Sequence, residues 1–161
     1  MKAILLSDSH GDVTGLRWML DQAWTRTGQV DAYFHMGDGA LDMVHLSGYL
    51  RAHDPQAEIF CVRGNCDFHA PNVRDTEVVT FGGSRILMTH GHDFQVKTTL
   101  ELLDEEAEQQ NCSIALYGHT HMPAMDMGRV LKINPGAAQD GRMGFLELEE
   151  GRPRIQLWHF A

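Results

Sequence analysis

The chain has 161 residues, of which 43% are hydrophobic and 22% charged; this is ordinary for a globular protein, and we expect one domain over residues 1–161. Its formal net charge is −9 and it has no lysine or arginine cluster, which argues against a stable complex with nucleic acid. It has no long apolar run and no CxxC pair among its three cysteines, so we expect no membrane segment and a reducing, cytoplasmic location.

The first part of the chain alternates short apolar runs with amphipathic segments. Lys2–Leu6 is typical of a strand that is buried on both faces. Asp12–Arg26 places Leu16 and Leu20 at helical spacing, and Gly28 follows as a stop signal. The alternation continues with a predicted strand at Ala32–Met36, a helix at Leu41–Ala52 and a strand at Glu58–Val62.

The rest of the chain is richer in strands. Gly82-Gly83-Ser84 stands between the apolar segments Glu77–Phe81 and Arg85–Met88, which indicates a hairpin. Lys97–Gln110 predicts a helix with an acidic, solvated face. Further strands are predicted at Ser113–Tyr117, Arg129–Ile133, Met143–Glu147 and Arg154–His159. This mixture indicates an α/β (α+β) protein with two packed sheets covered by helices, not one doubly wound sheet.

Five of the predicted strands end in turns rich in Asp, Asn, His and Gly. Because sheet proteins bind ligands at the carboxyl ends of strands, these five corners can converge on one site. The glycines fit that use, since they allow sharp turns and close approach. The five blocks are Asp8-Ser9-His10, Gly37-Asp38, Gly64-Asn65-Cys66-Asp67, His90-Gly91-His92 and Gly118-His119-Thr120-His121.

The side chains in these blocks are those of a metal site. Carboxylate, amide and imidazole groups suit borderline to hard divalent ions such as Mn, Fe, Ni or Zn. Asp8 and His10 alternate along the backbone, as do His119 and His121, so both members of each pair can face one centre. Two carboxylates and several imidazoles exceed what one tetrahedral ion needs, whereas two adjacent ions that share a carboxylate would use them all.

Taken singly, most blocks have a simpler interpretation. Asp-x-His and Gly-Asp are common turns, Gly-Asn suits a left-handed turn, and His90 and His92 alone can be loop histidines. Gly-His-x-His is the rarest of the blocks. The histidines outside the blocks are interpreted as surface or packing residues: His35, His45, His53, His69 and His159.

In this order, the blocks resemble the signature of calcineurin-like metallophosphoesterases. Gly64-Asn65-Cys66-Asp67, Asn134-Pro135-Gly136 and the small size resemble the compact bacterial and archaeal phosphodiesterase branch of that superfamily. The resemblance covers essentially the whole chain. It implies a four-layer αββα sandwich, in which two mixed sheets pack face to face between helices. It also implies a centre of two divalent metal ions, with manganese the expected species and Fe, Ni or Zn as alternatives.

The same resemblance implies the roles of individual residues. One ion would be held by Asp8, His10, Asp38 and His121. The other would be held by Asp38, Asn65, His90 and His119, so that Asp38 bridges the two. Asp38, Asn65 and His92 would serve catalysis, and Asn65, His92 and Cys66 would face the substrate.

Three positions depart from the pattern of the larger relatives. Cys66 stands where they usually have a histidine near the leaving group, which leaves the proton donor open. Leu41, with Asp42 next to it, stands where many have an aspartate, and Ala137 replaces a common serine. The last two positions concern supporting contacts, so they do not change the ligand assignment.

The resemblance therefore predicts an enzyme that hydrolyses a small phosphate ester, with a diester favoured over a monoester. The expected mechanism is in-line attack by a hydroxide that bridges the two ions. Two alternatives remain: a non-catalytic scaffold, like the retromer coat subunit of the same fold, and a slow-turnover sensor of a phosphorylated ligand. The complete set of seven ligands favours the enzyme. Exposed sheet edges are compatible with a homodimer.

Overall fold

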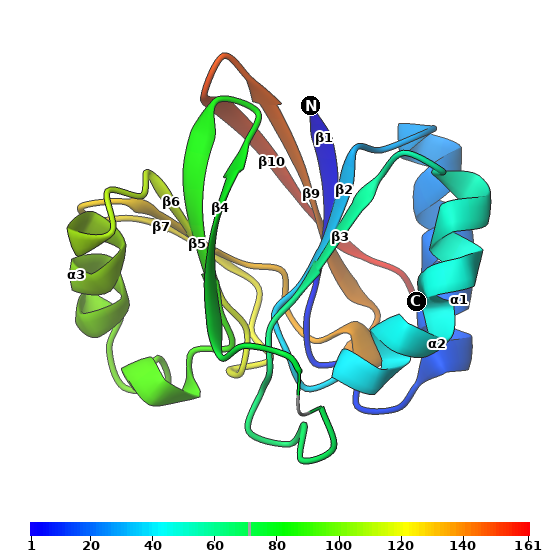
Figure 1. Ribbon diagram of the computed structural model, residues 1–161, viewed down its shortest axis with the longest axis horizontal. Helices are drawn as coiled ribbons and strands as arrows, with labels where there is room; N and C mark the ends of the chain where they lie inside the picture. The colour runs from blue at the N-terminus through cyan, green and yellow to red at the C-terminus, as the bar shows by residue number, and fades with distance from the viewer. Residues whose placement is uncertain (71) are drawn as a thin grey trace.

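A computed structural model describes residues 1–70 and 72–161. Over these residues the chain forms two five-stranded sheets packed face to face (Figure 1). Helices α1 (Val13–Thr27) and α2 (Ala40–His53) cover the outer face of one sheet, and α3 (Glu101–Gln109) covers the outer face of the other. The predicted four-layer αββα architecture is therefore confirmed. None of the described residues belongs to a helix long and apolar enough to cross a membrane.

The first sheet has the strand order β10-β9-β1-β2-β3. Its strands are β1 (Lys2–Leu6), β2 (Ala32–His35), β3 (Glu58–Cys61), β9 (Arg142–Glu149) and β10 (Arg152–His159). The first three run parallel, and β9 and β10 join antiparallel. Along β1, Ile4 and Leu6 face the helices whereas Ala3 and Leu5 face the second sheet. This two-sided burial explains why the segment is apolar at consecutive positions.

The second sheet has the strand order β4-β5-β6-β8-β7. Its strands are β4 (Thr76–Phe81), β5 (Ser84–Thr89), β6 (Ile114–Leu116), β7 (Ala124–Met127) and β8 (Leu131–Asn134). The predicted hairpin is present, because Phe81 pairs with Ser84 across a two-residue turn. Gly82 and Gly83 both have positive φ, +57° and +82°, as a type I′ hairpin turn requires.

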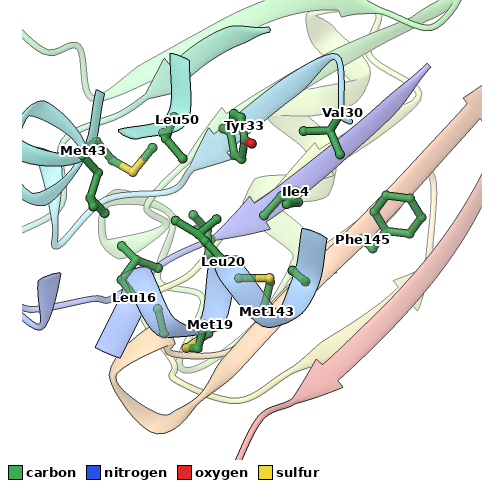
Figure 2. Packing of buried hydrophobic residues seen from close by; sticks show 14 of the residues in the cluster. Ile4, Leu16, Met19, Leu20, Val30, Tyr33, Met43, Leu50, Met143 and Phe145 are labelled. Carbon is green, nitrogen blue, oxygen red and sulfur yellow. The ribbon is translucent and has the colours of Figure 1, made fainter. Parts of the chain in front are cut away.

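The core has three parts, one in each space between adjacent layers. In the part beneath α1 and α2, Leu16, Leu20 and Met43 pack against Ile4 and Tyr33 of the sheet (Figure 2). All five of these side chains are buried. The middle part lies between the two sheets, and the third lies under α3.

The structure shortens one predicted helix and adds one strand. Helix α3 begins at Glu101 instead of Lys97, because the hydroxyl of Thr99 accepts a hydrogen bond from the Glu101 N–H and replaces a preceding helical turn. Strand β7 was not predicted. It is short, follows Pro123 and is largely exposed, so it lacks the apolar pattern of a buried strand.

The loops that carry the polar blocks lie at one edge of the sandwich. Those that follow β1, β3 and β5 are together along the lower edge of Figure 1, where segments distant in sequence approach one another. Because β1, β2 and β3 are parallel, their carboxyl ends necessarily share this edge. The fold therefore brings the five predicted corners to one place.

Candidate metal centre

Asp8, at the end of β1, lies at the middle of a group of imidazoles. Its Oδ1 is 3.2 Å from Nε2 of His121, 3.6 Å from Nε2 of His10 and 3.8 Å from Nε2 of His90. These rings come from the loops that follow β1, β5 and β6, which belong to both sheets. The predicted convergence of the corners is therefore present at the level of single atoms.

Asp38, after β2, lies between two of the same rings. Its Oδ2 is 3.2 Å from Nε2 of His90 and 3.7 Å from Nε2 of His10. Nδ1 of His119 lies 3.2 Å from the same His90 nitrogen. The donor atoms thus form one group of Asp8, His10 and His121 and another of Asp38, His90 and His119, and a third group of His10, Asp38 and Cys66 shares a residue with each of them.

The carboxylate of Asp8 provides a test of whether a cation fits here. Its Oδ2 accepts hydrogen bonds from the Ser7 hydroxyl and, at 3.0 Å, from the His119 N–H. Its Oδ1 is buried and has no hydrogen-bond partner among the described residues. A buried carboxylate oxygen without a donor is unfavourable, and a divalent cation beside it supplies the missing interaction. The donor set therefore fits a metal.

The backbone at the candidate ligands is in an unusual conformation. Five of the seven predicted ligands have positive φ: Asp8 (53°), His10 (47°), Asp38 (56°), His119 (68°) and His121 (62°). Such a conformation costs about 1 kcal/mol or more for a residue with a side chain, and it tends to cluster at functional sites. Strain concentrated at these five positions is an observation, independent of sequence motifs, that points to a ligand site.

Two glycines allow the loops to approach closely enough. A Cβ at Gly64 would lie 2.1 Å from Oδ1 of Asp38, and a Cβ at Gly118 would lie 1.9 Å from the Ser7 hydroxyl oxygen. Neither position can carry a side chain without moving the neighbouring group. The glycines of the Gly-Asn and Gly-His blocks are therefore required by contact with the two carboxylate-bearing loops.

Asp38 is oriented by the loop that follows β3. The backbone N–H of Cys66 donates to Asp38 Oδ1 at 2.8 Å, which leaves Oδ2 directed at the imidazoles. The carboxylate of Asp67 accepts hydrogen bonds from the N–H groups of Asp38, Gly39 and Gly64 at 2.7 to 3.0 Å. Asp67 was not assigned a role from sequence. In the folded chain its carboxylate lies at the N-terminus of α2, where it accepts from the N–H groups of Gly39 and Ala40, a contact between loops that the sequence does not record.

The protonation of the imidazoles follows from their partners. Nδ1 of His90 lies 2.7 Å from the Met36 carbonyl, which can only accept, so Nδ1 carries the proton and Nε2 is free to bind a cation. Burial lowers the pKa of His90, but Asp38 and Asp8 outweigh it, and the pKa lies above its ordinary value. Burial, with His90 adding to it, lowers the pKa of His119 to about 4, so that ring is neutral at pH 7.

His35, interpreted from sequence as a surface or packing residue, is buried but also hydrogen-bonded at both ring nitrogens. Nδ1 accepts from the Gly37 N–H at 3.2 Å, so Nε2 carries the proton and donates to the Ser9 hydroxyl at 3.0 Å. Ser9 donates to Asp42 Oδ2 at 2.6 Å, and the Gly11 N–H donates to the same oxygen at 2.9 Å. This series of hydrogen bonds connects the loops that carry Asp8, His10 and Asp38. A histidine within the apolar run 32–36 was its only sequence signal.

The predicted substrate-facing residues border the cluster. Asn65 is exposed, and its side-chain amide donates to Sγ of Cys66 at 3.5 Å. Cys66 is also exposed. Partial burial of its sulfur, and to a smaller extent the negative charge of Asp38, raise the pKa of the thiol. The ring of His92 lies 5.5 Å from that of His90, between centroids, and its Nδ1 is buried without a hydrogen-bond partner among the described residues.

Two grooves open beside the cluster. The first, the Leu41 groove, has a volume of about 290 Å³ and is lined by His10, Gly11, Asp38, Gly39, Leu41, Asp42, Cys66 and Asp67. The second, the Phe68 groove, has a volume of about 350 Å³ and is lined by Arg63, Gly64, Asn65, Asp67, Phe68, Asp75, His92 and Asp93. Arg63 is the one Lys or Arg among these described lining residues, and its Nε is 2.8 Å from Oδ1 of Asp75.

Comparison with known proteins assigns the family. Residues 1–147 match the model of the calcineurin-like phosphoesterase superfamily domain. The chain is 35% identical over 138 residues to the probable metallophosphoesterase YsnB of Bacillus subtilis (strain 168), covering 85% of this chain and 75% of that protein.

Solved structures agree with this assignment. A conserved protein of Streptococcus pneumoniae TIGR4, described as a predicted phosphoesterase, superposes with a TM-score of 0.75 at 29% identity over 98% of this chain and 88% of its own. An archaeal phosphodiesterase gives a TM-score of 0.73 at 21% identity over 98% and 100% of the two chains, which supports the fold alone. On the match of its sequence over residues 1–147, the chain belongs to the calcineurin-like phosphoesterase superfamily.

Proposed function

We propose that this chain, a metal-dependent phosphoesterase by family, is a phosphodiesterase with a dinuclear metal centre. The observation that carries the proposal is the pair of donor groups around Asp8 and around His90, which a third group joins through His10 and Asp38. Oδ2 of Asp38 lies between His90 and His10, and each of these rings belongs to a different predicted ion. One shared carboxylate with imidazoles on both sides is the arrangement that two neighbouring cations require.

The residues divide between the two ions as follows. One would be held by Asp8, His10, Asp38 and His121, and the other by Asp38, Asn65, His90 and His119. Divalent ions at such a centre lower the pKa of water and neutralise the charge of phosphoryl oxygens. The nitrogen and oxygen donors suit manganese, with Fe, Ni or Zn as alternatives.

The protein's own groups orient the reaction. The Cys66 N–H and Met36 carbonyl hold Asp38 and His90 in fixed positions, so the ligand atoms need little rearrangement. Asn65 is exposed at the edge of the cluster and offers its amide to a phosphoryl oxygen. His92 stands beside the second donor group, where its ring can hold a proton for the departing oxygen.

The surroundings of the centre favour a diester. A diester carries one negative charge and two organic substituents, whereas a monoester near neutral pH approaches two charges and has one substituent. The two grooves offer room on either side of the cluster, and Leu41 and Phe68 give each an exposed apolar side chain. The pairing of Arg63 with Asp75 leaves no uncommitted Lys or Arg among the described groove residues to bind a second charge.

A hydrolysis assay on metal-stripped protein tests the proposal. The chelated protein is expected to be inactive toward an activated aryl phosphate, and Mn²⁺ is expected to restore turnover. With Mn²⁺, a bis-aryl phosphate should react faster than the mono-aryl phosphate with the same leaving group. Full activity in metal-free protein would contradict metal dependence, and a strong monoester preference would contradict only the diester assignment.

The same assay separates an enzyme from the two alternatives. A scaffold would bind metal without turnover, and a sensor would turn over slowly with every ester offered. The positive φ values of the ligand loops and the six predicted ligands that lie in the donor groups support catalysis. The three cysteines are free, which supports the further proposal of a reducing, cytoplasmic environment.

A further inference from the structure

The thiol of Cys66 lies among metal-binding groups, yet the proposed reaction gives it no chemical task. Its Sγ, one ring nitrogen of His10 and one carboxylate oxygen of Asp38 all lie within 4.8 Å of one another. The Cys66 N–H donates to the Asp38 carboxylate at 2.8 Å, and the amide of Asn65 donates to the sulfur at 3.5 Å. Since Cys66 is exposed, an ion that enters from solvent meets this sulfur at the edge of the cluster.

A second observation shows that this group is part of a cation site. Oδ1 of Asp8 is fully buried, has no hydrogen-bond partner among the described residues, and lies 3.6 Å from the same His10 ring. The sulfur therefore lies in a donor group that shares His10 with a buried carboxylate oxygen lacking a hydrogen-bond partner among the described residues. It is not an isolated surface cysteine.

Sulfur differs from the other donors in its preference among metals. Imidazole, carboxylate and amide groups bind Mn²⁺, Co²⁺ and Zn²⁺ alike, whereas thiolate selects softer ions such as Zn²⁺ and Cd²⁺ and is a poor ligand for Mn²⁺. One thiol at the edge of the site is thus the group at which hard and soft ions would be treated differently.

We propose that Cys66 is a conditional metal ligand, which binds Zn²⁺, Co²⁺ or Cd²⁺ together with His10 and Asp38 but stays uncoordinated when the centre holds Mn²⁺. On coordination the S–H bond breaks, the proton passes to solvent, and a sulfur electron pair forms the bond to the cation; nothing is oxidised. A soft ion held this way has one position fewer for substrate. The proposal rests on the metal-dependent function proposed above.

Cobalt absorption spectroscopy tests this directly. Zn²⁺ is spectroscopically silent because its d shell is full, whereas Co²⁺ reports both its uptake, through d–d bands, and sulfur ligation, through a thiolate-to-metal charge-transfer band. The stripped wild-type protein should show both bands when Co²⁺ is added. Cys66→Ser should bind the same number of Co²⁺ ions but lose the charge-transfer band. Cys112→Ser, which changes a buried cysteine near α3, is the matched control and should resemble wild type.

Equilibrium binding provides a second measurement. Cys66→Ser should weaken Cd²⁺ binding about 10- to 100-fold, the range seen when a supporting metal contact is removed, and leave Mn²⁺ binding unchanged. A charge-transfer band that persists in Cys66→Ser, or cobalt uptake by wild type without such a band, would overturn this proposal alone. Failure of the wild-type protein to take up cobalt at all would overturn the metal-dependent function as well.

Discussion

Oδ2 of Asp38 lies 3.2 Å from Nε2 of His90, and a backbone hydrogen bond orients each of these two side chains. The other Asp38 oxygen is held by a backbone N–H, and the other His90 nitrogen is held by a backbone carbonyl. The atoms left facing each other are therefore the two that a cation would bind. This places Asp38 at the junction of the two donor groups.

Replacing Asp38 should affect both ions, and replacing His121 should affect one. Asp38→Ala removes the oxygen between His90 and His10, so we expect less than one ion per chain. His121→Ala removes a donor that belongs only to the group of Asp8 and His10, so about one ion should remain. Elemental analysis of the two variants gives the answer, with circular dichroism to show that both are folded. An equal loss of one ion in each would contradict the bridging role.

His92 should matter more as the leaving group becomes a poorer one. An alkoxide needs a proton as it departs, whereas an activated aryloxide does not, and His92 is the histidine beside the centre that is not assigned to a metal. His92→Ala is expected to reduce kcat on an alkyl diester about 100-fold and on an aryl diester much less. A loss of equal size on both substrates, with metal content unchanged, would mean that His92 acts on binding and not on the leaving group.

Folding stability should depend on pH through His35. Burial lowers its pKa to about 4 in the folded protein, while the unfolded chain binds a proton near pH 6.5. The contribution of neutral His35 to the free energy of unfolding is thus complete above about pH 6.5. It decreases by about 1.4 kcal/mol per pH unit for this single proton as the pH drops toward 4. His35→Gln should remove that part of the slope in urea unfolding of chelated protein.

The control for this measurement is His45→Gln on the exposed side of α2. This variant removes an exposed imidazole that takes no part in the hydrogen bonds of His35, so it should keep the wild-type slope. Chelation keeps metal release, which also depends on pH, out of the comparison. If His35→Gln unfolds with the wild-type slope, His35 does not account for the pH dependence.

Lys132 should be a major contributor to stability far from the centre. It is 1% exposed, and its Nζ is 2.7 Å from Oδ1 of Asp104 on α3 and 3.2 Å from Oδ2 of Asp126 on β7. Lys132→Met leaves the carboxylate of Asp104 without its cation, so we expect a loss of about 3 kcal/mol in the free energy of unfolding. Chemical denaturation measures it.

Exposed Lys97→Met, the matched control, should change stability by less than about 0.5 kcal/mol. Adding Asp104→Leu to Lys132→Met should recover part of the loss, because the uncompensated charge is removed together with its partner. A double variant as unstable as the sum of the two single variants would show that the pair acts only through packing.

The architecture was predictable because its strands are buried on two faces. Residues 3–6 and 32–34 are apolar without alternation, and this pattern belongs to strands enclosed between two layers. The two-glycine hairpin was predictable because Gly82 and Gly83 supply the positive φ values that such a turn needs. Strand β7 was not predictable, since it gains its order from pairing with β8 and not from burial.

The blocks that carry the candidate ligands can be recognised in the sequence, but the groups that hold them in position cannot. The candidate ligands stand in ordered blocks at strand ends, a local pattern that can be read along the chain. Asp67, His35 and Asp42 act through backbone N–H groups and a serine hydroxyl contributed by other loops. Such partners depend on how the loops meet in space, and no spacing in the sequence records them.

The left-handed backbone at five candidate ligands affects which amino-acid substitutions would stabilise this protein. Glycine adopts such φ values freely, so a sequence optimised only for folding would place glycine at Asp8, Asp38 or His121. The aspartate and histidine side chains at these positions therefore carry a backbone cost that glycine would avoid. Stabilising these loops by substitution with glycine should therefore relieve backbone strain but remove the candidate ligands, whereas substitutions in the helices avoid that conflict.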